Sequence, residues 1–353
     1  MDKIPSGKEG IAVLNGILAR YPEYERGHAR RAQLYYEAGE KYEALKDISR
    51  AIELDPSPFH FYKKGKWLYE SGYFERSLEA LSFAWEHLPN GPQRNEIAHL
   101  LARVYLALKE YENAHSFYEK ALAVQDMPGI RMEMAQVCHL LKKYDLLEKQ
   151  LRSLEAVSLP VAMKSEVEYY RGFLAFEKKD FVSAEISWEN ALKGLPKWAG
   201  ELHYRLALAC RELGKREKER AHLEKSAPFY PYNAEIPWML AQHYEVSDPK
   251  KAVALISQSI RLEPWRSDYY FKRGLLYRKI GQSEAGENDF LFCMELDPQD
   301  IRPFAELFND YNILMNPSKT EILFNHFRSF TFTDISPDLW EEEIDALKNS
   351  LRF

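Results

Sequence analysis

Apolar and polar positions recur along the chain with a period of about 34 residues, and each period predicts a pair of amphipathic helices. Three segments show the recurrence plainly: 51–56 reads AIELDP, 259–264 reads SIRLEP and 293–298 reads CMELDP. Each segment ends at a proline, which lacks the N–H that a continuing helix needs. The pattern therefore predicts a helix that ends at the same point of every period.

Nine prolines mark these helix ends at intervals of 32 to 39 residues. They are Pro22, Pro56, Pro89, Pro128, Pro160, Pro196, Pro231, Pro264 and Pro298. A small residue lies about 24 positions before six of them: Ala32, Gly65, Gly172, Ala207, Ala241 and Gly274. Small residues are needed where two helix axes cross closely, so these positions predict the contact between paired helices.

Glycines occupy the expected turn between the two helices of a pair in four periods, at Gly39, Gly72, Gly214 and Gly281. We expect them to adopt the left-handed conformation that commonly ends a helix.

Three periods depart from the pattern. Leu147 and Leu154 replace small residues in one second helix, Glu219 replaces one in another, and the closing proline of the third period is displaced.

This arrangement resembles the tetratricopeptide repeat, a unit of two antiparallel helices. Residues 267–298 carry the family's pattern at Tyr270, Gly274, Tyr277, Gly281, Phe290 and Pro298. We assign eight repeats: 25–56, 58–89, 95–128, 128–160, 165–196, 200–231, 234–264 and 267–298. The resemblance implies an all-α fold, an α-solenoid in which helix–turn–helix repeats form a right-handed superhelix.

The predicted domains are a repeat array over 1–298 and a non-repeat helical C-terminal cap over 299–353. Residues 7–22 read as a half repeat that precedes the array. Helices are expected in the cap at about 301–313, 318–329 and 337–351. A repeat array needs its last interface covered, which a cap provides. The alternative is that this segment regulates access to the array.

Composition excludes several classes of partner. The net charge of −6 is spread without a basic block, so we expect no nucleic acid to bind. No stretch approaches 18 uninterrupted apolar residues, so we expect no membrane insertion. The N-terminus shows no signal-peptide pattern, and Cys138, Cys210 and Cys293 are too far apart for a disulfide framework. These features predict a cytoplasmic protein.

The sequence contains no recognisable catalytic, cofactor or metal motif, so we expect no enzyme activity, no cofactor and no metal. The cysteines fall on repeat positions and read as small core residues. His99 and His139 lie one repeat apart without a further ligand at metal spacing.

The resemblance implies that first helices line the concave wall, where ligands of this family usually lie. Helical spacing then predicts which side chains point inward. The predicted partner-binding residues are Tyr62, Tyr69, Arg103, Tyr169, Phe173, Phe176, Tyr204, Trp238 and Phe271. Family members that bind chaperone tails use a two-carboxylate clamp. The positions that would form this clamp in the first three repeats hold Ala29 and Gln33, Tyr62 and Lys66, and His99 and Arg103. The clamp is therefore absent. The alternative for each aromatic residue is that it packs on the next repeat.

These observations predict a non-catalytic interaction scaffold that binds a segment of an unidentified protein partner along the groove. The alternative is a self-assembling structural protein, a homo-oligomer built through the end repeats and the segment 338–353. Its Leu339, Trp340, Ile344, Leu347 and Leu351 would share one apolar helix face. For the scaffold we expect Phe173→Ala with Trp238→Ala to weaken partner binding by more than about 2 kcal/mol without unfolding the array.

Overall fold

The computed structural model describes residues 5–89, 91–313, 318–319 and 321–323, which fall into two units, 1–178 and 179–353. The first unit contains ten α-helices in its described part. They are α1 Gly7–Arg20, α2 Glu25–Glu37, α3 Lys41–Leu54, α4 Pro58–Glu70, α5 Phe74–His87, α6 Pro92–Ala107, α7 Tyr111–Val124, α8 Pro128–Leu140, α9 Tyr144–Glu155 and α10 Val161–Glu177.

The second unit contains eight α-helices and two short 3₁₀ turns in its described part. They are α11 Phe181–Gly194, η1 Pro196–Trp198, α12 Ala199–Glu212, α13 Arg216–Ser226, η2 Ala227–Phe229, α14 Glu235–Tyr244, α15 Pro249–Leu262, α16 Ser267–Lys279, α17 Ser283–Leu296 and α18 Ile301–Ile313. No strand occurs in the described ranges.

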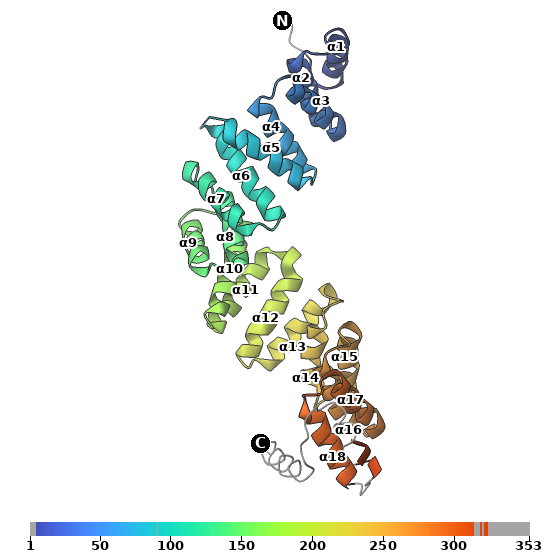
Figure 1. Ribbon diagram of the computed structural model, residues 1–353. Coiled ribbons are helices and arrows are strands. Elements are labelled where there is room, and N and C mark those ends of the chain that lie inside the picture. The colour runs from blue at the N-terminus through green and yellow to red at the C-terminus, as the bar shows by residue number, and fades with distance from the viewer. Residues whose placement is uncertain (1–4, 90, 314–317, 320, 324–353) are drawn as a thin grey trace. The chain divides into compact units, whose positions relative to one another are not determined.

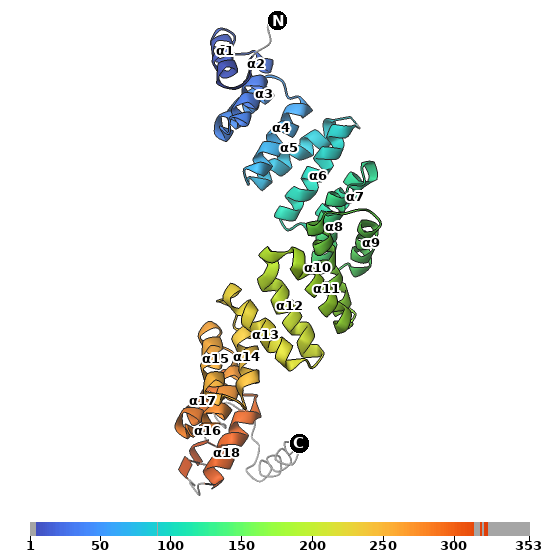
Figure 2. The ribbon, with the colours of Figure 1, turned by 180° about the vertical axis from the view of Figure 1, so that it is seen from behind.

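Each predicted repeat contains two helices, and α1 is the predicted half repeat. Within each unit, helices that are neighbours in the sequence pack on one another, as Figures 1 and 2 show from opposite sides. The predicted all-α solenoid is therefore confirmed. The division between the two units falls inside the fifth repeat, between α10 and α11. The predicted domain boundary after residue 298 stays a prediction.

Glycines hold the paired helices at close range, as the sequence predicts. A Cβ built on Gly65 of α4 would lie 2.6 Å from Cγ of Leu81 in α5. A Cβ on Gly274 of α16 would lie 2.7 Å from Cε1 of Phe290 in α17. Both partner side chains are fully buried, so neither has free space into which it could move. A larger residue at these positions would push the helix pair apart.

In two of the irregular repeats, larger residues occupy the positions that small residues hold elsewhere, and they make different contacts. Leu147 and Leu154 of α9 are fully buried and belong to the core around α8 and α10. Glu219 of α13 is also buried and is paired with Arg211 at 3.1 Å and with His243 at 3.4 Å. A buried carboxylate at this place needs such partners, because its desolvation is otherwise uncompensated.

The turn inside each helix pair uses a left-handed residue. Gly39, Gly72, Gly214 and Gly281 have φ values between 68° and 82°, which confirms the prediction for these four positions. Three further repeats place lysines in the same conformation: Lys109, Lys142 and Lys179. Lysine carries a Cβ that disfavours this region. Backbone hydrogen bonds close the turn nevertheless, as in that from Glu110 N–H to the Tyr105 carbonyl at 2.9 Å.

The described part of the C-terminal segment covers the last repeat. Phe304 and Leu307 of α18 pack with Phe290 and Met294 of α17, and Leu323 joins the same cluster. Of the predicted helix 318–329 only 318–319 and 321–323 are described, and they are helical. The predicted helix 337–351 lies outside the described residues. Within the described ranges, no helix combines the length and apolar character that a membrane crossing requires.

We predict that Gly65→Ala destabilises the first unit by about 1–3 kcal/mol, because the new methyl group overpacks against Leu81. The free energy of unfolding, measured by urea titration with circular dichroism, checks this.

Gly16→Ala in α1 is the matched control, since a Cβ there meets no atom within 4 Å. Alanine favours a helix more than glycine does, so this control should gain about 0.5–1 kcal/mol. Equal effects of the two substitutions would contradict the close crossing at Gly65.

Candidate functional site

The first unit places three predicted site residues on α4 and α6. Tyr62 is 7% exposed, and burial followed by the neighbouring Glu96 carboxylate raises its pKa. Tyr69 is half-buried, and the Arg103 guanidinium lies 5.1 Å from the centre of its ring. The structure thus brings Tyr69 and Arg103 together, whereas Tyr62 belongs mainly to the packed interior.

Charged groups extend this arrangement across α4, α6 and α8. Lys66 binds Glu96 at 2.9 Å. Glu133 accepts hydrogen bonds from His99 at 2.8 Å and Tyr118 at 3.0 Å. Burial alone would raise the pKa of Glu133, but His99 and Arg103 hold this pKa below its usual value.

Arg103 is the least constrained member of this group. Its Nε lies 3.8 Å from Glu133, which is the long end of an ion pair, and its side chain is 42% exposed. We call Lys66, Tyr69, Arg103 and Glu133 the first-helix band, because consecutive first helices supply them.

The predicted residues of α10 form an aromatic cluster. Tyr169 and Phe173 meet edge to face with ring centres 4.9 Å apart, and the His139 ring lies 4.3 Å from Phe173. Phe173 is only 7% exposed, while Tyr169 and Phe176 are half-buried. The alternative interpretation, packing on the neighbouring repeat, therefore holds for Phe173.

Because Phe173 is buried, its substitution affects the stability of the fold as well as any binding of a partner. Removal of a buried phenylalanine typically costs about 3–5 kcal/mol, through lost burial and the cavity that remains. Phe173→Ala is thus expected to destabilise the first unit, contrary to the expectation of an unchanged fold. Binding experiments need the half-exposed residues instead.

The second unit holds the remaining predicted residues, all half-buried. The ring of Tyr204 lies 6.3 Å from that of Tyr230, and Trp238 lies 4.9 Å from Tyr269. Phe271 lies 5.8 Å from Phe290 and carries the Arg302 guanidinium at 4.7 Å. These contacts fix the rings in place, and each ring keeps part of its surface accessible.

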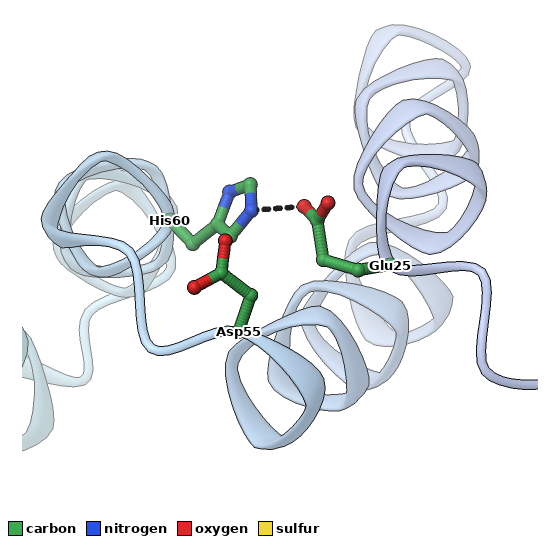
Figure 3. A group of neighbouring side chains, drawn as sticks. All are labelled: Glu25, Asp55 and His60. Carbon is green, nitrogen blue, oxygen red and sulfur yellow. Dashed lines mark hydrogen bonds and ion pairs between the residues drawn. The ribbon is translucent and has the colours of Figure 1, made fainter.

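A cluster of ligand-type side chains occurs between the first two repeats. Glu25 at the start of α2, Asp55 after α3 and His60 in α4 have their ligand atoms within 4.8 Å of one another (Figure 3). His60 Nε2 is paired with Glu25, and both side chains are largely buried, at 12% and 20% exposure. Two carboxylates and an imidazole are also donors that a zinc ion accepts.

Other repeat junctions show a similar contact made by arginine. Arg302 follows Pro298 by four residues, as His60 follows Pro56, and it binds Asp268 of the preceding first helix at 2.7 Å. Arg266 pairs with Glu235 and Glu263 at 3.5 and 3.6 Å. Because arginine is not a metal ligand, the recurring feature is an ion pair that ties consecutive repeats. We call it the junction ion pair, and at the first junction it is the contact between His60 and Glu25.

Two histidines face each other inside the second unit. The Nδ1 atoms of His203 in α12 and His222 in α13 lie 2.9 Å apart. Burial lowers the pKa of both groups, and the nearby His203 and Lys225 help to lower that of His222 to about 4. At neutral pH one imidazole donates a hydrogen bond to the other.

The three cysteines are fully buried and unpaired, which confirms their assignment to the core. Burial raises the pKa of Cys138 and Cys210 to about 11 and that of Cys293 to about 12. The thiols are therefore protonated at neutral pH and poorly nucleophilic.

One surface lies outside the sequence prediction. A groove of about 1150 Å³ runs between α3 and α5, with α4 as its floor. Its signal in the sequence is a stripe of apolar and basic residues with helical spacing on each of these helices. That signal becomes readable only when the three helices are known to adjoin.

Comparison with known proteins supports the assignment of the fold. A family model described as tetratricopeptide repeat matches residues 26–58, 96–126 and 267–300. A solved structure, the C-terminal part of a TPR repeat-containing protein from Cytophaga hutchinsonii, matches with a TM-score of 0.54 and 15% identity. It covers 66% of this chain and 95% of that one.

Two curated proteins match the chain over different lengths. A TPR repeat-containing protein of Methanocaldococcus jannaschii is 22% identical over 321 residues, which are 84% of this chain and 54% of the relative. A UDP-N-acetylglucosamine–peptide N-acetylglucosaminyltransferase of Giardia intestinalis is 37% identical over 65 residues, 18% of this chain and 4% of the transferase. The chain thus spans about half of the first relative and a small part of the second.

The paired helices, the family matches and the fold together define a helical repeat protein. The family model identifies tetratricopeptide repeats in the chain, and the same pairing of helices recurs through the described residues.

We predict that His60→Ala destabilises the first unit by about 1–3 kcal/mol, because Glu25 loses its partner in a largely buried site. His60→Arg should retain most of the stability, since arginine fills the similar place at Arg302. Urea unfolding of the two variants checks this. Zinc binding that calorimetry detects in the natural chain and that His60→Arg abolishes would instead show a metal site.

We predict that the free energy of unfolding falls as the pH drops from about 6.5 towards about 4, and that protonation of His222 contributes to this fall. The unfolded state binds a proton to this histidine at a higher pH than the folded state does, so acid favours unfolding. His222→Gln should reduce the loss of the urea midpoint between neutral pH and about pH 5. An unchanged loss would show that other groups cause it.

Proposed function

We propose that the chain is a non-catalytic scaffold that binds a segment of a partner protein across its first helices. The observation that carries this proposal is the first-helix band. The Arg103 guanidinium lies over the Tyr69 ring, and its ion pair with Glu133 is long. The guanidinium is therefore held in place and can still form a closer ion pair with another group. Such a guanidinium can pair with an acidic side chain of a partner, and the tyrosine face offers apolar contact beside it.

The band is accessible as well as ordered. The side chains of Lys66, Arg103 and Glu133 are 37%, 42% and 32% exposed. Their mutual contacts hold them in place, which lowers the entropy cost of binding a partner. Because both signs of charge are present, the partner segment should carry an acidic group for Arg103 and a basic group for Glu133, beside apolar residues.

The second unit offers similar groups of its own. Trp238 and Phe271 are half-buried rings on consecutive repeats, and Lys272 on the second of these first helices is paired with Glu245 at 2.9 Å. Contacts of this kind in several repeats would distribute the binding energy, with aromatic residues as its main points.

The properties of the cysteines support a role without catalysis in a reducing compartment. Their thiols are buried, unpaired and protonated, so they are poor nucleophiles. We therefore propose a cytoplasmic location. The relationship to the Giardia transferase covers 4% of that enzyme, so its activity is not proposed for this chain.

We predict that Tyr69→Ala with Arg103→Gln weakens binding of the natural partner by about 2 kcal/mol or more. Both side chains are half-exposed, so the fold should persist. Affinity purification from native extract with quantitative mass spectrometry identifies the partner. Calorimetry with the purified partner then measures the loss.

Tyr42→Ala is the matched control, because Tyr42 is 76% exposed and lies in the groove between α3 and α5. The control should keep the partner. A partner that is retained by the band variant and lost by the control would contradict the proposal.

A further inference from the structure

The groove in the first unit is built from three parallel stripes of side chains. Its floor is Phe61, Lys64 and Leu68 of α4. One wall carries Tyr42, Leu45, Lys46 and Ser49 of α3, and the other carries Arg76, Glu79, Ala80 and Phe83 of α5. Each stripe spans eight residues, which is about two helical turns or 10 Å.

Apart from Lys64, the floor of the groove is apolar, and the groove is partly open. Phe61 and Phe83 meet with ring centres 4.1 Å apart, and Leu68, two turns further along α4, is buried. Tyr42 and Tyr73 at the rim are 76% and 53% exposed. A volume of about 1150 Å³ exceeds the range of about 300–1000 Å³ for small-molecule sites, so the groove suits a peptide segment.

The charged residues that line the groove are predominantly basic. Lys41, Lys46, Lys64 and Arg76 line the groove, against Glu70 and Glu79. Lys41 donates to the backbone carbonyl of Glu70, and Lys46 has a long, exposed contact of 3.9 Å with Glu43. Among the described residues Lys64 and Arg76 have no ion pair or hydrogen-bonded side-chain partner. The matching occupant therefore has an apolar face with acidic side chains on its flanks.

The chain itself contains a segment with these properties. Residues 338–345 read DLWEEEID, with five acidic residues and no basic one. Trp340, Ile344 and Leu347 recur at the spacing of one helix face and also span eight residues. The segment lies outside the described residues, and its sequence alone matches the groove in charge and length. We call residues 338–351 the acidic segment.

We propose that the groove between α3 and α5 binds the acidic segment of a second copy of this chain. Trp340, Ile344 and Leu347 would meet the floor around Phe61 and Leu68. The glutamates 341–343 would lie near Lys64 and Arg76 and form ion pairs with these two cations, which have none among the described residues. Each copy carries one groove and one segment, so the contacts can be reciprocal in a dimer or continue into a chain of copies.

This proposal does not depend on the proposed function. Phe61, Lys64 and Leu68 occupy a different face of α4 from Lys66 and Tyr69 of the first-helix band. One surface can therefore hold copies of the chain together while the other holds a different protein.

A charge exchange tests the proposal on the full-length chain. The groove variant combines Lys64→Glu with Arg76→Glu, and the segment variant combines Glu341→Lys, Glu342→Lys and Glu343→Lys. Sedimentation velocity from about 1 to about 100 µM compares them with the natural chain. We expect the natural chain to self-associate more weakly as salt rises. Each variant should raise the dissociation constant about tenfold or more.

Restored association identifies the contact itself. An equimolar mixture of the two variants has complementary charges at both contacts, so it should associate like the natural chain. One chain that carries all five substitutions should do the same. Circular dichroism confirms that the variants are folded.

Two controls separate this contact from general charge effects and from the proposed function. Lys8→Glu with Lys149→Glu reverses two exposed lysines of the first unit outside the groove and should leave association unchanged. Tyr69→Ala with Arg103→Gln should also leave it unchanged. A natural chain that stays monomeric at about 100 µM would overturn the proposal. Variants that associate normally, or a mixture that fails to recover association, would also overturn it.

Discussion

The close crossing of paired helices at small residues is the constraint on which the rest of the structure depends. At Gly65 and Gly274 the neighbouring helix approaches so closely that one methyl group would collide with a fully buried side chain. This contact sets the distance between first and second helix in a repeat. Prolines then end the second helices and left-handed residues end the first, so the next repeat begins in the same way.

In the first unit, this packing leaves two chemically different surfaces. The first helices present aromatic rings and paired charges of both signs around Tyr69 and Arg103. The second helices α3 and α5 enclose a groove that Lys64 and Arg76 line, and neither cation has an ion pair with another described residue. The first surface suits a partner of mixed charge, and the second suits an acidic apolar segment. The junction ion pair of Glu25 and His60 joins the first two repeats, whose helices α3 to α5 form the groove.

The sequence was sufficient to predict the helix pairs, the glycine turns and the buried cysteines. Each of these depends on a local pattern or on a residue type with few alternatives. It could not predict the left-handed conformation of Lys109 and Lys142, since the preference of lysine is against it and the turn is closed by backbone hydrogen bonds that any residue can make. Helical spacing located Tyr62 and Phe173 on a helix face but did not reveal that neighbouring repeats bury them. The groove and the junction ion pair join residues of two or three helices, so no single stretch of sequence contains them.

The account centres on the claim that the first helices contact the partner protein. Hydrogen–deuterium exchange of the full chain, with and without its purified partner, tests this claim most directly. The account predicts slower exchange on binding in α4, α6 and α8, where the first-helix band lies. Protection confined to α3 and α5, with α6 and α8 unchanged, would contradict it and assign the partner to the groove.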